Sequence, residues 1–210
     1  MQRKHRGFTL IEIAIVLIII GLLLGGVLKG QEMINQGKIR SIAKELDGIS
    51  VAVLGYRDRY KALPGDDDKA DGRWGGFAKG DGNGTLTGNF NSTTTTDESN
   101  ILWRHLRRAG FVSGDANATT LPLNAAGGIL GVQSDLKNAT GTLIPGMAVC
   151  ATELPAAVAN AIDAQLDDGK PDAGTIRGFS QSAANTPDLD TVITAYTDDG
   201  KALFTLCKPV

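Results

Sequence analysis

The sequence predicts an α+β protein, in which a long N-terminal helix packs by its second half on a small antiparallel sheet. Two observations lead to this prediction. A long apolar block stands near the N-terminus and continues into an amphipathic helical pattern. The later part of the chain alternates short apolar runs with turns rich in Gly, Asn, Asp and Thr, a pattern typical of short strands.

The apolar block runs from Phe8 to Leu28 and contains one charged residue, Glu12. A helix needs about 20 apolar residues to span a bilayer. Basic residues precede the block and polar residues follow it, so we expect residues 1–6 in the cytoplasm and the rest outside. The block is too long for a cleavable secretory signal peptide. An uncleaved signal anchor fits the hydropathy but leaves the carboxylate of Glu12 unexplained.

The stretch RGFTLIEIAIVLIIIGLL resembles the processing and methylation motif of type IV prepilins and type II secretion pseudopilins. The resemblance covers about residues 1–30 and consists of a short basic leader ending in Gly7, then Phe8, Glu12 and an apolar helix. It implies that a prepilin peptidase cuts between Gly7 and Phe8 and methylates the new amine of Phe8. In a filament, Glu12 of one subunit would pair with this amine of its neighbour. A buried charge without a partner is strongly unfavourable, so the pair would set the axial register.

The resemblance implies a structural subunit, major or minor, of a type IV pilus or a type II secretion pseudopilus, with a pilin-like fold. Its partners would be copies of itself, other pilins or pseudopilins, the prepilin peptidase, an inner-membrane assembly platform and, before assembly, inner-membrane lipid. We expect a single-pass inner-membrane protein with a periplasmic C-terminal domain, which enters a pilus or pseudopilus on assembly. The alternative is an uncleaved, signal-anchored periplasmic binding protein that does not polymerise.

The helical pattern continues beyond the apolar block as one stripe of apolar residues spaced by three and four. The stripe comprises Ile39, Ile42, Leu46, Ile49, Val53, Tyr56 and Tyr60. We expect the helix to extend to about Ala62, because Pro64 disfavours helical geometry in the residue before it. The stripe could form a short coiled coil, but we favour packing on a sheet of the same chain. The expected organisation is a cleaved leader (1–7), a transmembrane and assembly helix (8–28), its amphipathic continuation (29–62) and an exported globular domain (63–210).

The expected exported domain begins with a long loop anchored by Trp74, Phe77 and Phe90. A helix should follow, starting around residues 97–99 and ending at Gly110. Another helix is expected over residues 155–166. The strand candidates are GILGV, AVCA, TIRGF and ALFTLC.

The two cysteines, Cys150 and Cys207, both stand late in the chain. If this part is exported to an oxidising compartment, we expect a disulfide between them, and if it is cytosolic, two buried thiols. The membrane segment favours export. The family resemblance points the same way, because pilins frequently close a C-terminal region with a disulfide.

An acidic cluster offers candidate calcium ligands, because calcium takes oxygen donors. The cluster comprises Asp66, Asp67, Asp68, Asp71, Asp81 and Asn83, and the calcium candidates among them are Asp66, Asp68, Asp81 and Asn83. Counted from Asp81, however, the twelfth position of a helix–loop–helix calcium loop is Ser92 rather than glutamate. We therefore expect no metal site and interpret the cluster as a solvated acidic turn.

No catalytic motif is recognisable, so we expect neither an enzyme nor a cofactor. The two histidines are His5 in the leader and His105 in a basic run with Arg104, Arg107 and Arg108. We interpret this run as a solvated helix face. With a net charge of −2, nucleic acid is not an expected partner.

Overall fold

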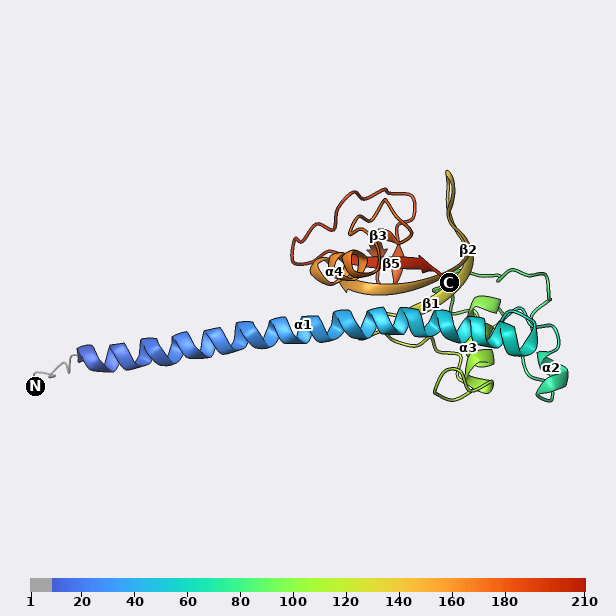
Figure 1. The fold of residues 1–210 in the computed structure, drawn as a ribbon, viewed down its shortest axis with the longest axis horizontal. Coiled ribbons are helices and arrows are strands. Elements are labelled where there is room, and N and C mark those ends of the chain that lie inside the picture. The colour runs from blue at the N-terminus through green and yellow to red at the C-terminus, as the bar shows by residue number, and fades with distance from the viewer. Residues whose placement is uncertain (1–8) are drawn as a thin grey trace, which may run out of the picture. The chain divides into compact units, whose positions relative to one another are not determined.

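The computed structural model describes residues 9–210 (Figure 1). The chain divides into two compact units, residues 1–37 and residues 38–210. Its elements are α1 (Leu10–Tyr60), α2 (Ala70–Arg73), α3 (Glu98–Arg108), β1 (Leu130–Asn138), β2 (Gly141–Pro155), α4 (Ala156–Leu166), β3 (Arg177–Ala183), β4 (Thr186–Pro187) and β5 (Leu203–Pro209).

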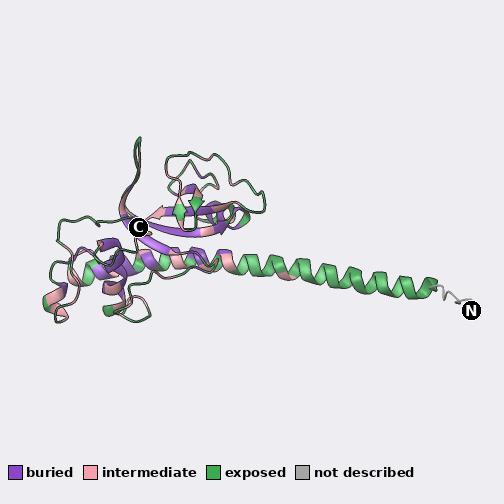
Figure 2. Ribbon diagram, turned by 180° about the vertical axis from the view of Figure 1, so that it is seen from behind, coloured by how far each residue is buried: buried purple, intermediate pink, exposed green. Residues whose placement is uncertain are grey.

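In the first unit, helix α1 exposes its apolar side chains all around its circumference (Figure 2). Leu10 is 89% exposed, and Leu28, at the end of the apolar block, is still 67% exposed. The helix continues without a break through Gly25 and Gly26. Helix α1 is long and apolar enough to cross a membrane, judged by its length and composition.

In the second unit, α1 changes from fully exposed to one-sided burial (Figure 2). Its buried residues are Ile39, Ile42, Ala43, Leu46, Ile49, Ala52, Val53 and Tyr56. The predicted stripe is thus buried, apart from Tyr60 at its end, which is only partly buried. Burial of each fully buried Ile or Leu side chain contributes about 1.5–3 kcal/mol to stability, so the buried face of α1 stabilises its packing within this unit. The helix ends at Tyr60, slightly before the expected Ala62, because Lys61 adopts a positive φ of 55°.

The five strands form one antiparallel sheet in the order β1-β2-β5-β3-β4. Strands β1 and β2 form a hairpin, while the last strand, β5, inserts between β2 and β3. The fold is therefore the predicted α+β arrangement of a long N-terminal helix packed by its second half on an antiparallel sheet.

The sheet is buried on both faces, because residues that alternate along its strands belong to different core clusters. Val149 and Ala151 face the main core, which also contains the α1 stripe and apolar residues of α3 and α4. Cys150, between them, belongs to a smaller cluster with Phe90 and Phe179. This two-sided burial explains why AVCA reads as a continuous apolar run.

The predicted helices are present, and each strand candidate overlaps an observed strand, but β1 extends beyond GILGV to Asn138 and β2 begins at Gly141, well before AVCA. Helix α3 ends at Arg108, and Gly110 follows it with a φ of 80°. Helix α2 is a single turn within the long loop and β4 has two residues, and neither was predicted from the sequence. Elements this short have no hydrophobic periodicity that could reveal them.

Candidate assembly site

The N-terminal turn of α1 is closed by a reciprocal capping box between Thr9 and Glu12. The backbone N–H and the hydroxyl of Thr9 both donate to Oε2 of Glu12, each at 2.8 Å. The backbone N–H of Glu12 in turn lies 3.3 Å from the Thr9 hydroxyl, which accepts its hydrogen bond. This is the arrangement of a threonine N-cap with a glutamate three residues later, and it satisfies N–H groups that no helical carbonyl can reach.

The capping box gives Glu12 a role that its charge alone did not indicate. The T-x-x-E spacing of a capping box is present in the sequence, but Glu12 was interpreted only through its charge. The side chain is exposed in the single chain. Gly7 and Phe8, the predicted cleavage and methylation site, lie outside the described residues, and these assignments remain predictions.

The helix surface beyond the capping box is an uninterrupted apolar face. Exposed patches larger than a few hundred square ångströms mark membrane or protein contacts in general. At Gly21, Gly25 and Gly26, an added Cβ would meet no atom within 4 Å among the described residues. Such glycines let another helix approach the backbone closely. This surface can therefore serve both a bilayer and a bundle of helices.

At the other end of the chain, Cys150 and Cys207 form a disulfide. The two residues are directly opposite each other on β2 and β5. Both are fully buried, on the face of the sheet opposite the α1 stripe. The bridge thus fixes the last strand of the chain to the centre of the sheet.

The acidic loop differs from the expected solvated turn. Asp66 is 4% exposed, and its carboxylate accepts the backbone N–H groups of Gly82 at 2.7 Å, Asn83 at 3.0 Å and Gly84 at 2.8 Å. Burial raises the pKa of the Asp66 carboxyl above its ordinary value, although the three N–H donors act in the opposite direction. The carboxylate closes the loop over residues 66–84.

Glu98 belongs to the same loop structure, a role that was not predicted from the sequence. It is 4% exposed and accepts the backbone N–H groups of Asp81 at 3.0 Å and Thr87 at 2.9 Å. Carboxylate oxygens of Asp66, Asp81 and Glu98 lie within 4.8 Å of one another. The carboxylate oxygens of Asp66 and Glu98 already accept hydrogen bonds from backbone N–H groups. The positive ends of these N–H groups would repel a cation. Asp68, a further calcium candidate, is exposed. In this geometry the carboxylates of Asp66 and Glu98 close the loop, and the expectation of no metal site remains a prediction.

Asp67 is fully buried and links this loop to α1. Its Oδ2 accepts the hydroxyl of Tyr56 at 2.6 Å and Nη1 of Arg73 at 2.5 Å. Burial has the largest effect on the pKa of Asp67 and raises it, but the hydrogen bonds from Arg73 and Tyr56 hold the pKa below its ordinary value. The prediction of a solvated turn is thus wrong for both Asp66 and Asp67, because each has backbone or cationic donors that replace water.

The basic run on α3 is not a solvated face either. His105 is fully buried; its Nδ1 accepts the N–H of Gly65 at 2.9 Å, and its Nε2 lies 2.7 Å from the carbonyl oxygen of Ala78. Both contacts are satisfied by a neutral imidazole with its proton on Nε2. Arg104 lies over the ring of Phe77 at 4.9 Å, and Arg107 donates to two carbonyl oxygens of the following loop. Only Arg108 of this run is exposed.

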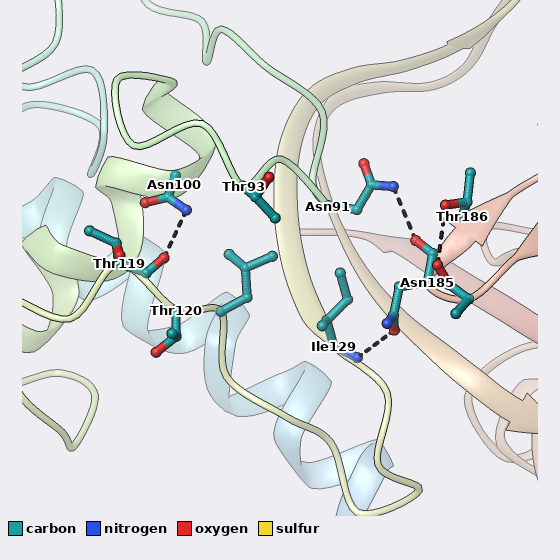
Figure 3. Close-up of a pocket in the computed structure, with 10 residues that line it drawn as sticks. Asn91, Thr93, Asn100, Thr119, Thr120, Ile129, Asn185 and Thr186 are labelled. Atoms are coloured by element: carbon teal, nitrogen blue, oxygen red, sulfur yellow. Dashed lines mark hydrogen bonds between the residues drawn. The ribbon is translucent and has the colours of Figure 1, made fainter.

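A cavity of about 510 Å³ lies between the loops flanking α3 and the turn from β3 to β4 (Figure 3). Nδ2 of Asn91 donates to the carbonyl oxygen of Asn185 at 3.0 Å, which joins two of its walls. The lining is neutral and consists of Asn91, Thr93, Asn100, Thr119, Thr120, Leu121, Ile129, Ala184, Asn185 and Thr186. It contains no carboxylate, imidazole or thiol, so it offers no acid–base pair for catalysis.

Residues 2–28 match the prokaryotic N-terminal methylation motif. Among solved structures, the chain is similar to the major type IV pilin PilA1 from Clostridium difficile, with 12% identity, coverage of 82% of this chain and 96% of that chain, and a TM-score of 0.34. It is also similar to a type IV b pilin from Salmonella typhi, with 22% identity, coverage of 58% and 82%, and a TM-score of 0.33. No curated protein matches the chain.

The chain is thus a protein with a prepilin-type N-terminal methylation motif, as predicted from its first residues. It combines this motif with a membrane-length apolar helix, a buried helical stripe packed on an antiparallel sheet, and a C-terminal disulfide.

Proposed function

We propose that the chain is a structural subunit, major or minor, of a type IV pilus or a type II secretion pseudopilus. A prepilin peptidase cuts it between Gly7 and Phe8 and methylates Phe8, and the mature subunit assembles through its N-terminal helix. The observation that carries the proposal is the methylation motif over residues 2–28, which includes the first part of a helix with an exposed apolar surface.

The capping box supports a specific part for Glu12 in assembly. Its carboxylate is already at the N-terminal turn of α1, the end of the helix that carries partial positive charge. Cleavage before Phe8 adds a full positive charge next to this turn and leaves the N–H of Thr9 in place. In an apolar bundle, the amine of one subunit and the carboxylate of another would each be costly to bury alone. Their pairing therefore favours one axial register.

The proposed pathway places the subunit first in the inner membrane, with residues 63–210 in the periplasm, and then in the filament. Its partners are other copies, further pilins or pseudopilins, the prepilin peptidase and the assembly platform. The disulfide supports an oxidising location for the C-terminal part. The competing possibility is a signal-anchored periplasmic binding protein that keeps its leader and does not polymerise.

The mass and N-terminal sequence of the membrane-bound protein test the proposal. We expect a chain that begins with methylated Phe8. Gly7→Ala should largely block maturation, and Gly7→Val should block it fully, because a side chain at this position obstructs the peptidase. Gly48→Ala is the matched control, since Gly48 is an exposed α1 residue where an added Cβ meets no atom within 4 Å.

Two results would contradict the proposal. One is an intact leader on all of the wild-type protein in its native cells, which would favour the signal-anchored alternative. The other is a Gly7→Val chain that is still shortened by seven residues. In sheared surface fractions, the wild-type protein should cosediment with filaments, whereas the Gly7→Val protein should remain in the membrane.

A further inference from the structure

Four segments of the second unit carry the pattern Asn-x-Thr, with x other than proline. In exported proteins, this pattern is the acceptor for N-linked glycosylation. The four asparagines are Asn83, Asn91, Asn117 and Asn138. A composition rich in Asn and Thr produces such patterns by chance, so the pattern alone selects none of them. Their surroundings in the structure differ.

Three of the asparagines are held by the fold. Nδ2 of Asn83 donates to a carboxylate oxygen of Asp81 at 2.8 Å, and Nδ2 of Asn91 donates to the carbonyl oxygen of Asn185 at 3.0 Å. Asn138 is half-buried at the end of β1, where its Oδ1 accepts the hydroxyl of its own pattern's threonine at 2.8 Å. At Asn83 and Asn91 the nitrogen that would carry the sugar already donates a hydrogen bond, and at Asn138 the threonine hydroxyl of the pattern is already bonded to the asparagine.

Asn117 differs from these three asparagines because its side chain is exposed and is not held by a hydrogen bond within the described residues. It lies in the loop after α3, and within residues 9–210 its side-chain amide makes no hydrogen bond. The hydroxyl of Thr119 is likewise exposed and has no hydrogen-bond partner in that range. The backbone between them is nevertheless fixed, since Arg107 donates to the carbonyl oxygens of Ala118 at 2.8 Å and Thr120 at 3.0 Å. The loop thus presents both side chains of the pattern on its surface.

We infer that Asn117 is a site of N-linked glycosylation. The donor would be an oligosaccharide carried on a polyprenyl diphosphate. Nδ2 of Asn117 forms a bond to the anomeric carbon, and the bond from that carbon to the diphosphate oxygen breaks. The lipid diphosphate leaves with the bonding electrons, and the amide nitrogen gives one proton to a base of the transferase. The inference rests on the proposed function only for the export of this part of the chain.

The last residue of the Asn117 pattern, Thr119, lines the neutral cavity (Figure 3). Thr119 and Thr120, directly after the modified segment, line that cavity together with three asparagines. Hydroxyl and amide groups can both donate and accept hydrogen bonds, which matches the hydroxyl groups of a neutral sugar.

The test is mass spectrometry of the full-length mature chain purified from its native cells. Trypsin should release the peptide of residues 109–137, which contains Asn117 and, outside any acceptor pattern, Asn124. We expect a glycan on Asn117. Asn117→Gln and Thr119→Val should each abolish it completely, whereas Thr119→Ser should retain it. Asn138→Gln, at a pattern that the fold holds, is the matched control and should leave the peptide modified.

An unmodified peptide from the wild-type chain would overturn the inference, and so would a sugar attached to a threonine hydroxyl or retained in Asn117→Gln. The same sample reports the N-terminus and the disulfide. A cleaved, disulfide-linked chain without a glycan would refute the inference and leave the proposed function intact. A glycosylated chain that keeps its leader would refute the proposed function and support the inference.

Discussion

Cys150 and Cys207 occupy directly opposite positions on neighbouring antiparallel strands, with their Cα atoms 4.1 Å apart. They are separated by 57 positions in the sequence. The bridge therefore closes a long loop in the unfolded chain, and in the chain-entropy model such a closure stabilises the fold by about 4 kcal/mol. The backbone pairing of β2 with β5 does not depend on it.

We expect that alkylation of the denatured protein without reductant leaves both cysteines unmodified, because a disulfide has no free thiol. The double variant Cys150→Ala and Cys207→Ala should keep the fold but unfold at a temperature lower by about 10 °C, from a loss of about 4 kcal/mol. Circular dichroism of the full chain in detergent measures both the secondary structure and the unfolding temperature of this variant. Two freely labelled thiols in the native protein would contradict the disulfide.

The next prediction concerns the hydroxyl of Tyr56, which donates to the buried carboxylate of Asp67 at 2.6 Å. Tyr56→Phe removes this donor and leaves the carboxylate with less compensation for its burial, at a cost of about 1–3 kcal/mol. Tyr60→Phe is the matched control, because Tyr60 packs on the Tyr56 ring at 4.6 Å but its hydroxyl makes no hydrogen bond within residues 9–210. Chemical denaturation should separate the two variants, and equal losses of stability would argue against the role of the Tyr56–Asp67 bond.

The locations of Asp66 and His105 show where the prediction from sequence failed. The α1 stripe was predictable because its periodicity is local, and parts of β1, β2, β3 and β5 were predictable from short apolar runs between turns. The environment of a polar side chain depends instead on partners far along the chain. Asp66 meets its N–H donors 16 to 18 residues later, and His105 meets Gly65 at a distance of 40 residues. Asp66 and His105 both have charged neighbours in the sequence, and this favoured the interpretation that their side chains are exposed to solvent.

His105 predicts a pH dependence of stability. Burial lowers the pKa of its imidazole below the ordinary value of 6.5. In the unfolded chain His105 takes up a proton below about pH 6.5, while the folded state resists it, so the unfolded state binds more protons and stability falls as the pH falls. The slope should approach about 1.4 kcal/mol per pH unit below pH 6.5, until the folded pKa is reached.

His105→Gln should remove this component of the slope between pH 6.5 and 5, because glutamine does not titrate. The carboxylates contribute to both chains equally, so the difference between the two pH profiles isolates His105. Melting temperatures of the wild-type and variant chains across this range measure the difference. Parallel profiles would show that His105 takes up its proton without loss of the fold.

The last prediction separates the two roles of Glu12, helix capping and charge pairing. Glu12→Val removes both, and by insertion scales it should also ease membrane insertion by about 2.5–3.5 kcal/mol. Glu12→Gln removes the charge but keeps a capping side chain, because glutamine also closes a capping box. Thr9→Val keeps the charge and removes the hydroxyl that bonds to it at 2.8 Å. We expect all three variants to be cleaved after Gly7, since the peptidase recognises the leader and that glycine.

Assembly should depend on the charge of Glu12 and not on its capping hydrogen bonds with Thr9. Glu12→Val and Glu12→Gln should give stable, cleaved, membrane-bound subunits that are missing from sheared filaments, because the amine of Phe8 enters the apolar bundle without its partner. Methylation of Phe8 should also fall in these two variants, since Glu12 stands four positions after Phe8 in the sequence, the spacing of one helical turn. Thr9→Val should enter filaments. Quantitative immunoblots of sheared and membrane fractions measure the distribution. If Glu12→Gln subunits reach filaments at wild-type levels, the charge of Glu12 does not set the register; if Thr9→Val fails as completely as Glu12→Val, the cap is the essential feature.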